Sequence, residues 1–489
     1  MLWLLLLIPT GAGLLAMTLR RQARLRRWLL MTTAAAHAAL TAAAWVLRPE
    51  PVLYGWLGLD HASLLFLSIT SSLFMAASAY AAGYLRREPP RKTDFQEGLL
   101  FTDAPEARFV GCLMLFLATM TLVAESRHLG LLWVGVEATT LASAPLIYFH
   151  RHHRSLEATW KYLLICSVGI ALALQGNFFL AVAAKGTPEV HLTIEHLMAG
   201  SRQLDPLWLK AAFLLLLVGY GTKMGLAPMH TWLPDAHSEA PSVVSALLSG
   251  ALLNCAFLGI LRVHAIMGAA GLGDFSSQLL IGLGLVSMAV AAVFIIEQAD
   301  FKRMLAYSSV EHMGILSLGA GLGGLAGMGS MLHMVNHSFT KAMLFLLAGN
   351  ILAAYRTKST RQVRGLLQAQ PLTGPLWLAG FLAIAGSPPF GLFVSELIIL
   401  KGALQGGHVL VATAYLLALG VIFAAMARSV LQMAYGTPEG AVPGPARTQE
   451  AWAVLPPMAL GAIVLALGVY MPAWLVKALS DAAQAAGVH

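Results

Sequence analysis

Residues 223–241 read KMGLAPMHTWLPDAHSEAP, and this stretch decides how the chain folds. It joins two apolar segments, and Gly225 and Pro228 stand where the first of these would otherwise continue as a helix. A similar interruption, GSPPFG at 386–391, divides a later apolar segment. Proline removes a backbone donor and glycine favours turns, so both stretches predict membrane helices that are broken near their middle.

The composition of the chain is that of an integral membrane protein. Of its 489 residues, 58% are hydrophobic and only 11% are charged, whereas soluble domains carry about 25% charged residues. A helix needs roughly 20 apolar residues to cross a bilayer. We therefore predict an all-α, polytopic protein of about fourteen transmembrane helices. The predicted segments are 2–19, 28–47, 59–85, 107–124, 129–149, 160–183, 207–227, 241–264, 277–297, 303–322, 328–351, 374–397, 408–432 and 451–475.

The distribution of cationic residues predicts the orientation of these helices. The chain has 31 lysines and arginines and a net charge of +8, but the cations cluster in short loops between apolar segments. With both termini outside, 21 of the 31 fall on the inner side and 8 on the outer side. Cytoplasmic loops carry the excess of lysine and arginine. We therefore predict an inner (cytoplasmic) membrane protein with both termini on the outer side and no nucleic-acid partner.

The two interruptions occupy equivalent positions along the chain. Each falls in the fourth helix of a five-helix block, so helices 7 and 12 are the broken ones. Because five is odd, the second block enters the membrane from the opposite side, which predicts two inverted five-helix repeats with an ion path at the midplane. The predicted units are an N-terminal three-helix segment with cytoplasmic loops (1–106), a first repeat (107–264), a second repeat (265–435) and a C-terminal loop with the final helix (436–489). The alternative is a passive bundle with two kinked helices.

Four charged residues stand out inside the predicted membrane helices: Glu137, Lys223, Lys341 and Glu396. Inserting one such charge costs on the order of 2.5–3.5 kcal/mol, so each is a functional candidate. Glu137 and Lys223 are best considered together, because the charge on each depends on how closely the other approaches. A lysine of this kind is a switchable proton store. The alternative is a fixed buried ion pair, which seldom repays its desolvation cost.

His333, His337 and Lys341 are spaced by four residues, which places them on one helix face. We predict that this stripe hands protons along the helix. Paired histidines can also bind zinc, but no carboxylate completes the motif on that helix and the lysine repels a divalent cation, so we predict no metal. The simpler alternative for either histidine is an interior side chain bonded to a backbone carbonyl.

Further polar candidates lie after the first break and in the tenth helix. Four of them occupy the inner-side connection between helices 7 and 8: His230, Asp235, His237 and Glu239. We predict that they serve proton entry or an interface with a peripheral partner, and the alternative is that they cap the next helix. Glu311 and His312 lie two to three turns into the tenth helix and are further proton-path candidates. Glu125 and Arg127, at an outer helix end, are expected to be ordinary interface charges.

The chain offers no redox centre of its own. Cys112, Cys166 and Cys255 each stand alone inside an apolar segment, where cysteine usually acts as a small hydrophobe. They cannot form an iron–sulfur or zinc site. We therefore expect no catalytic residue and no cofactor in this chain, with redox chemistry supplied by partner subunits.

Four motifs make the chain resemble the antiporter-like subunits shared by respiratory complex I, membrane-bound group 4 hydrogenases and multisubunit sodium/proton antiporters. They span about two thirds of the chain, and the longest is the stretch 223–241. The others are DFKRMLAYSS at 300–309, HSFTKAMLF at 337–345 and GSPPFGLFVSE at 386–396. Within this family, GYGTKMG at 219–225 and YSSVEHMG at 307–314 resemble the F-type membrane subunit of hydrogenase-4 and formate hydrogenlyase-like complexes.

The resemblance implies a role for each membrane charge. Glu137 would be the acid of the fifth helix, Lys223 its paired lysine, Lys341 the central-axis lysine of the second half and Glu396 the terminal acid. Several relatives have a lysine in the eighth helix where this chain has Asn254, which can support a water chain but cannot store a proton. Implied partners are lipids, other membrane subunits and a peripheral redox arm with iron–sulfur clusters, and with a nickel–iron centre if that arm is a hydrogenase.

We predict that the chain translocates protons through a buried Glu/Lys/His axis coupled to redox chemistry in partner subunits. Two alternatives remain open. Sodium could be the transported ion, with backbone carbonyls at the two breaks as its ligands, which would make the chain a sodium/proton antiporter subunit. The other alternative is a non-conducting scaffold of the membrane arm, in which loss of Lys223 would leave proton pumping intact.

Overall fold

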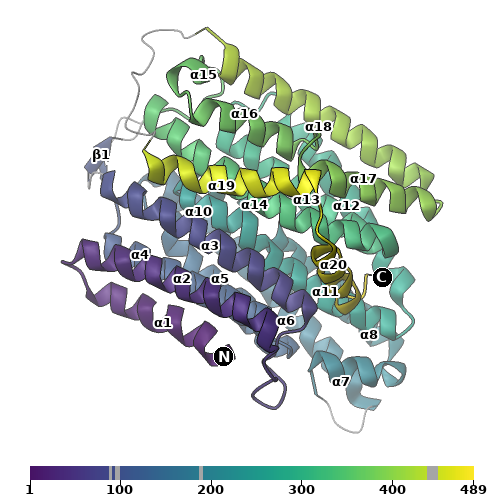
Figure 1. Cartoon of the computed structure of the whole chain (residues 1–489). Helices are drawn as coiled ribbons and strands as arrows, with labels where there is room; N and C mark the ends of the chain where they lie inside the picture. The colour runs from purple at the N-terminus through teal and green to yellow at the C-terminus, as the bar shows by residue number, and fades with distance from the viewer. Residues whose placement is uncertain (88–90, 94–99, 187–190, 438–449, 489) are drawn as a thin grey trace.

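The computed structural model describes residues 1–87, 91–93, 100–186, 191–437 and 450–488. Its long helices run side by side in one bundle (Figure 1). The helices are α1 (Leu2–Thr18), α2 (Ala23–Leu47), α3 (His61–Arg87), α4 (Glu106–Glu125), α5 (Leu129–Ile147), α6 (His153–Ala183), η1 (Ala184–Gly186), α7 (Ile194–Ala199), η2 (Ser201–Gln203), α8 (Pro206–Met224), α9 (Trp232–Glu239), α10 (Ser242–Leu247), η3 (Leu248–Leu252), α11 (Leu253–Ala269), α12 (Gly273–Ile295), α13 (Phe301–Leu322), α14 (Gly324–Tyr355), α15 (Leu366–Ala369), α16 (Thr373–Ile384), α17 (Gly391–Gln405), α18 (Val409–Tyr435), α19 (Ala451–Val469) and α20 (Ala473–Ala485). A short antiparallel hairpin consists of β1 (Arg91–Thr93) and β2 (Leu100–Thr102).

All fourteen predicted membrane segments are helical. Among the described residues, eleven helices are long and apolar enough to cross a membrane. The other three predicted segments correspond to α1, with 17 residues, to α13, with 22 residues and several polar side chains, and to the interrupted pair α16 and α17. The predicted class, a polytopic all-α membrane protein, is confirmed.

Both predicted helix breaks are present and share one form. α8 ends at Met224, and Gly225, with φ +85°, turns the chain toward α9. α16 ends at Ile384, and Gly386, with φ +61°, begins the loop that leads to α17. Glycine adopts a left-handed φ without a steric penalty, which explains its presence at both turns. After the first break, α9 packs against α6 and α13 instead of continuing α8.

The eighth predicted helix is not uniform. A π-helical turn, η3, joins α10 to α11 at Leu248–Leu252, and the sequence pattern did not predict it. Such turns are rare and occur frequently at functional sites. This one directly precedes Asn254, whose amide donates to the Gly250 carbonyl at 2.9 Å and to Ser338 Oγ at 2.8 Å.

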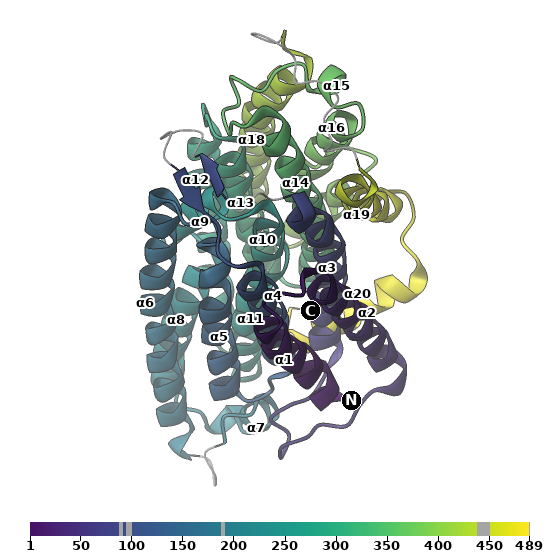
Figure 2. The same cartoon turned by 90° about the vertical axis from the view of Figure 1, so that its left-hand side faces the viewer.

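The C-terminal region differs from the prediction. We expected one final helix over 451–475, but α19 ends at Val469 and a separate helix, α20, follows Pro472. A proline at this position ends the preceding segment because it cannot donate a helical hydrogen bond. α20 packs against α3 and α14, and Figure 2 shows it crossing the bundle beside α3.

Both ends of the described chain lie where α3 begins. Leu5 of α1 packs with Leu67 of α3, and Asp481 of α20 lies 3.6 Å from His61 at the start of α3. An even number of crossings requires this arrangement. The cellular side on which this end lies stays a prediction.

Small residues allow the helices to approach closely. Helices in lipid gain little from burying apolar surface against one another, so their association depends on close packing at small side chains. A Cβ atom on Gly219 of α8 would lie 2.6 Å from the carbonyl oxygen of Gly169 in α6. A Cβ atom on Gly284 of α12 would lie 2.7 Å from the carbonyl oxygen of Gly314 in α13. These two helix pairs therefore depend on glycine at their contacts.

Candidate functional site

The first cluster of buried polar groups centres on Lys223, at the last turn of α8. Its ammonium group is fully buried and donates to Thr140 Oγ1 at 2.8 Å and to the Tyr162 hydroxyl at 2.6 Å. Thr140 in turn donates to Glu137 Oε2 at 3.3 Å. No ion pair joins Glu137 to Lys223 within the described residues. The expected pairing is therefore indirect, because the Thr140 hydroxyl lies between the two charged groups.

Tyr162 belongs to this cluster and was not selected from the sequence. Its hydroxyl lies 2.6 Å from Ser143 Oγ, and Lys223 Nζ lies 4.5 Å from the centre of its ring. An ammonium group near an aromatic face gains a cation–π attraction that strengthens when water is excluded. Tyr162 could have been identified from the sequence, because it stands within an apolar segment and a buried tyrosine hydroxyl needs a hydrogen-bond partner.

Glu137 lies at the edge of the bundle. It is partly exposed, and its second oxygen accepts from Ser167 of α6 at 3.3 Å. Large apolar side chains surround it on the outer face of α5 and α6, and they include Leu141 (64% exposed) and Val168 (65% exposed). A neighbouring membrane subunit or lipid that covered this face would come close to the Glu137 carboxylate.

The second cluster brings together three histidines from α13 and α14. His312 Nδ1 lies 2.9 Å from His333 Nε2, and His333 Nδ1 lies 3.0 Å from Ser395 Oγ of α17. The ring centres of His312 and His337 are 5.0 Å apart. The predicted His333–His337 stripe is therefore joined by His312 from the tenth predicted helix, and Ser395 was not anticipated.

Lys341 lies one turn beyond His337 and bonds to backbone instead of to a carboxylate. Its ammonium group is fully buried and donates to the Leu305 carbonyl at 2.7 Å. Glu311 Oε2 accepts from Ser308 at 3.3 Å and lies 3.9 Å from His312 Nε2. Lys341 and Glu311 therefore flank the histidine cluster without forming a contact ion pair in the described part of the chain.

Glu396 of α17 completes the second cluster. Side-chain donor atoms of His312, His333 and Glu396 all lie within 4.8 Å of one another, and all three residues are buried. The carboxylate that the His333 helix lacks is thus supplied by another helix, and the set of donors resembles a two-histidine, one-carboxylate metal site. Our prediction of no metal rested partly on the absence of such a carboxylate, and it stays a prediction.

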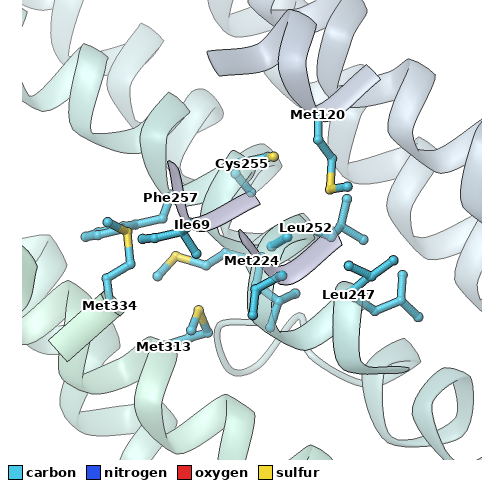
Figure 3. Packing of buried hydrophobic residues seen from close by; sticks show 14 of the residues in the cluster. Ile69, Met120, Met224, Leu247, Leu252, Cys255, Phe257, Met313 and Met334 are labelled. Carbon is cyan, nitrogen blue, oxygen red and sulfur yellow. The ribbon is translucent and has the colours of Figure 1, made fainter. Parts of the chain in front are cut away.

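The two clusters are not joined by hydrogen bonds among the described residues. Met224 follows Lys223, Met313 follows His312 and Met334 follows His333, and these three methionines lie together with Cys255 and Phe257 in the apolar core (Figure 3). The Asn254 Oδ1 atom has no hydrogen-bond partner in the described chain. Direct hydrogen bonds between described residues therefore do not connect Lys223 to the histidines, where we expected one continuous polar axis.

The inner-side residues after the first break have different environments. Asp235 is held by Lys161 at 2.9 Å and by Arg303 at 2.6 Å, and Glu239 by Lys358 at 2.8 Å. Burial alone would raise the pKa of Glu239, but the charge and hydrogen bond of Lys358, together with the charges of Arg154 and His152, outweigh burial and lower the pKa. These ion pairs hold α9 in place.

The two histidines of this connection are mostly buried. His237 is fully buried and stacks on Phe345, with ring centres 4.9 Å apart, and neither ring nitrogen has a hydrogen-bond partner among the described residues. His230 is 7% exposed, and its ring centre lies 6.1 Å from that of Tyr307. His237 therefore faces the interior instead of an inner-side partner.

Our expectation for Glu125 was wrong. We predicted an ordinary interface charge, but Glu125 is fully buried and neither carboxylate oxygen has a hydrogen-bond partner in the described chain. Arg127 pairs with Glu195. Helix α1 packs against α4 and removes Glu125 from the surface, which a pattern read from α4 alone could not show.

Comparisons with known proteins agree with this arrangement. Residues 126–422 match the family described as NADH:quinone oxidoreductase/Mrp antiporter, TM. The chain is 36% identical over 425 residues to a hydrogenase-4 component F homolog from Methylacidiphilum infernorum, covering 86% of each protein. It is 31% identical over 432 residues to NADH-quinone oxidoreductase subunit L from Mycobacterium tuberculosis, covering 86% of this chain and 64% of that protein.

The fold also matches a subunit of a solved membrane complex. A chain of the Mrp complex from Dietzia sp. DQ12-45-1b superposes with a TM-score of 0.85 at 21% identity, covering 99% of this chain and 97% of that one. At 21% identity, this match shows only that the two chains share a fold. The sequence matches and the shared fold together show that the chain belongs to the NADH:quinone oxidoreductase/Mrp antiporter family and is an antiporter-like membrane subunit of the complex I, hydrogenase-4 and Mrp type.

Proposed function

We propose that this chain translocates protons through two half-paths. The first leads from Glu137 through Thr140 to Lys223, over hydrogen bonds of 3.3 and 2.8 Å. The second uses the groups of the other cluster, which lie on α13, α14 and α17: Lys341, Glu311, His337, His312, His333 and Glu396. Titratable groups within hydrogen-bonding reach of each other or of one water are what proton transfer requires.

The observation that carries this proposal is the hydroxyl between Lys223 and Glu137. A contact ion pair would favour the charged form of both groups and make each a poor proton carrier. Thr140 accepts from the ammonium group and donates to the carboxylate, so a change of charge on Glu137 reaches Lys223 without a fixed ion pair. Lys223 can then release or accept a proton as that hydrogen bond changes.

The position of Glu137 supports coupling to a partner. Because Glu137 lies at the bundle edge, we propose that a neighbouring membrane subunit covers this face and passes on the electrostatic effect of redox chemistry. The named relatives belong to a hydrogenase-4 and a NADH-quinone oxidoreductase. The peripheral arm, with its iron–sulfur clusters and, in the hydrogenase case, a nickel–iron centre, would therefore lie in partner chains.

The two half-paths of this proposal lie in different parts of the chain. We place the first half-path in residues 107–264 and the second in residues 265–435, with 1–106 and 436–489 as flanking segments. We place the chain in the cytoplasmic membrane with both termini outside. His230, His237 and Asn254 would then lie between the inner side and the two half-paths, where water could connect them.

Substitution of Lys223 in the assembled complex tests the proposal. Lys223→Ala should abolish redox-driven acidification of inverted membrane vesicles, while the complex still assembles. Lys210→Ala is the matched control, because Lys210 lies on the same helix and is only partly buried. Unchanged pumping in Lys223→Ala would contradict the proposal and favour a scaffold. Proton movement that requires sodium would show that the chain exchanges the two ions.

A further inference from the structure

A pocket opens at the lateral surface of the first repeat, where ends of α4, α5 and α6 meet. Its volume is about 320 Å³, and its polar lining includes Arg108, Tyr148 and Arg151. Leu141, Ala144 and Leu163 form part of its apolar wall. α5 and α6 pack against each other and stand at the left of the bundle in Figure 2.

The two arginines of this pocket have no counter-charge among the described residues. Both are exposed, and neither guanidinium group forms an ion pair or a hydrogen bond with any residue that the structure describes. The acidic residues nearby in sequence are already engaged: Asp103 with His150, Glu106 with Arg26 and Arg27, and Glu157 with Lys161. The pocket therefore carries two positive charges that the described chain does not neutralise.

The polar residues of the pocket lie at the helix ends, and its apolar residues lie further along the helix axes. Tyr148 caps the C-terminal end of α5. Leu141 lies seven residues earlier, about 10 Å further along the helix axis. Pro145 lies between them on the pocket wall and cannot donate to the Leu141 carbonyl, which therefore lacks its usual helical partner. An occupant with an anionic head and an apolar tail, aligned with the membrane normal, matches this order.

We propose that this pocket binds an anionic phospholipid, with its phosphodiester between Arg108 and Arg151 and part of an acyl chain against Leu141 and Leu163. Basic pockets between membrane helices on the cytoplasmic side favour anionic head groups, and arginine binds phosphate through paired N–H donors. Leu141 follows Glu137 by one helical turn on the same face of α5. The lipid would therefore lie beside the proton-path acid and affect its surroundings.

Lipid retention by the purified full-length chain tests this proposal. The probes are detergent micelles that contain phosphatidylglycerol or phosphatidylcholine, and bound lipid is counted by native mass spectrometry. Wild type should retain phosphatidylglycerol in preference, and Arg108→Gln/Arg151→Gln should lower that retention by roughly thirtyfold. The matched control is Arg24→Gln/Arg361→Gln, which removes two exposed arginines that make no side-chain contact with acidic residues of the described chain and should leave retention unchanged.

A second variant separates a lipid from a free anion. Leu141→Trp fills the apolar part and keeps both arginines, so it should reduce phosphatidylglycerol retention while binding of inorganic phosphate stays as in wild type. Equal retention by wild type and the double arginine variant would overturn the proposal. Displacement of the lipid by millimolar inorganic phosphate would also overturn it.

Discussion

A single hydroxyl group determines how the two charged residues of the first half-path communicate. Thr140 Oγ1 lies between Lys223 Nζ and Glu137 Oε2, at 2.8 and 3.3 Å. Neither charged residue reaches the other directly within the described chain, so the path depends on a residue that carries no charge itself. The same holds for Tyr162, which gives Lys223 its second acceptor.

Replacing Thr140 by valine should slow proton translocation strongly. The change keeps the shape of the side chain and removes the hydroxyl, and hydrogen bonds to charged groups contribute about 1.5–3 kcal/mol, or roughly ten- to hundredfold in rate. Proton uptake by reconstituted vesicles measures the effect. Thr139→Val is the control, because Thr139 bonds only to the Val136 carbonyl of its own helix. Equal rates for wild type and Thr140→Val would show that the hydroxyl is not part of the path.

Asp60 and Arg262 form a pair at the end of the bundle where α3 begins, and this pair should make stability depend on pH. Arg262 is 1% exposed and donates to Asp60 at 2.8 Å. Burial alone would raise the pKa of Asp60, but the charge and hydrogen bonds of Arg262, together with the Ser63 backbone N–H and the Arg127 charge, outweigh burial and hold the pKa at about 2. The folded-state pKa lies below the unfolded value of 3.8, so the stabilisation is present above about pH 4 and is lost as the pH falls toward 2.

Asp60→Asn should therefore lower the stability of the chain near pH 7 by about 3–5 kcal/mol, because it leaves a buried guanidinium group without its counter-charge. Thermal unfolding in detergent, followed from pH 7 down to pH 3, measures this. The difference between wild type and variant should shrink as the pH approaches 2. If the difference in stability between wild type and Asp60→Asn stays constant across this pH range, the Asp60–Arg262 pair is not the source of the pH dependence.

At the scale of helices, the bundle is held by contacts that only glycine permits. α12 and α13 approach so closely that a Cβ atom on Gly284 would lie 2.7 Å from the Gly314 carbonyl oxygen. α13 carries Glu311 and His312, so the position of these residues depends on the contact. The broken helices depend in turn on Gly225 and Gly386, whose left-handed φ values end α8 and begin the loop after α16.

Gly284→Leu should separate α12 from α13 and destabilise the chain by about 1–3 kcal/mol or more, since backbone atoms must move to admit the side chain. Gly282→Leu is a matched control on the same helix, because nothing lies within 4 Å of a Cβ atom at Gly282. Thermal stability in detergent and proton translocation should both fall for Gly284→Leu alone. Similar losses in the two variants would show that leucine is harmful for reasons other than this contact.

In the whole molecule, two polar clusters are not joined by direct hydrogen bonds among the described residues. Lys223 belongs to the first cluster and His312, His333 and Lys341 to the second. Met224, Met313 and Met334 lie together in the apolar core, and methionine side chains are unbranched and adaptable. The η3 π-turn and the unpartnered Asn254 Oδ1 atom lie beside this core.

If the two half-paths act in series, variants of their lysines should not add. Lys223→Ala and Lys341→Ala should each abolish proton translocation, and the double variant should lose no more than either single one, as residues that act as one unit do. Vesicle acidification by the assembled complex measures all three. Partial activity in each single variant, with a greater loss in the double variant, would instead indicate two independent channels.

The class of fold, and the charged residues proposed for the site, follow from the order of residues along the chain. Apolar segments of membrane-spanning length, and glycine and proline at two equivalent breaks, are local signals that survive in any arrangement of the helices. Charged residues within apolar segments, such as Glu137, Lys223, Lys341 and Glu396, could be found from the sequence because charge in an apolar segment is costly. The His333–His337 spacing followed from helical geometry alone.

Only the tertiary structure decided how these residues meet. Thr140 between Glu137 and Lys223, and His312 beside His333, are contacts between different helices, which one-dimensional spacing does not encode. Glu125, at the end of α4, is buried in the folded bundle, where α1 packs against α4. Met224, Met313 and Met334 come from three different helices and meet in the apolar core. Contacts between helices depend on the orientation and packing of every helix at once, so spacing along the chain indicated which residues could form a path but not the order in which they connect.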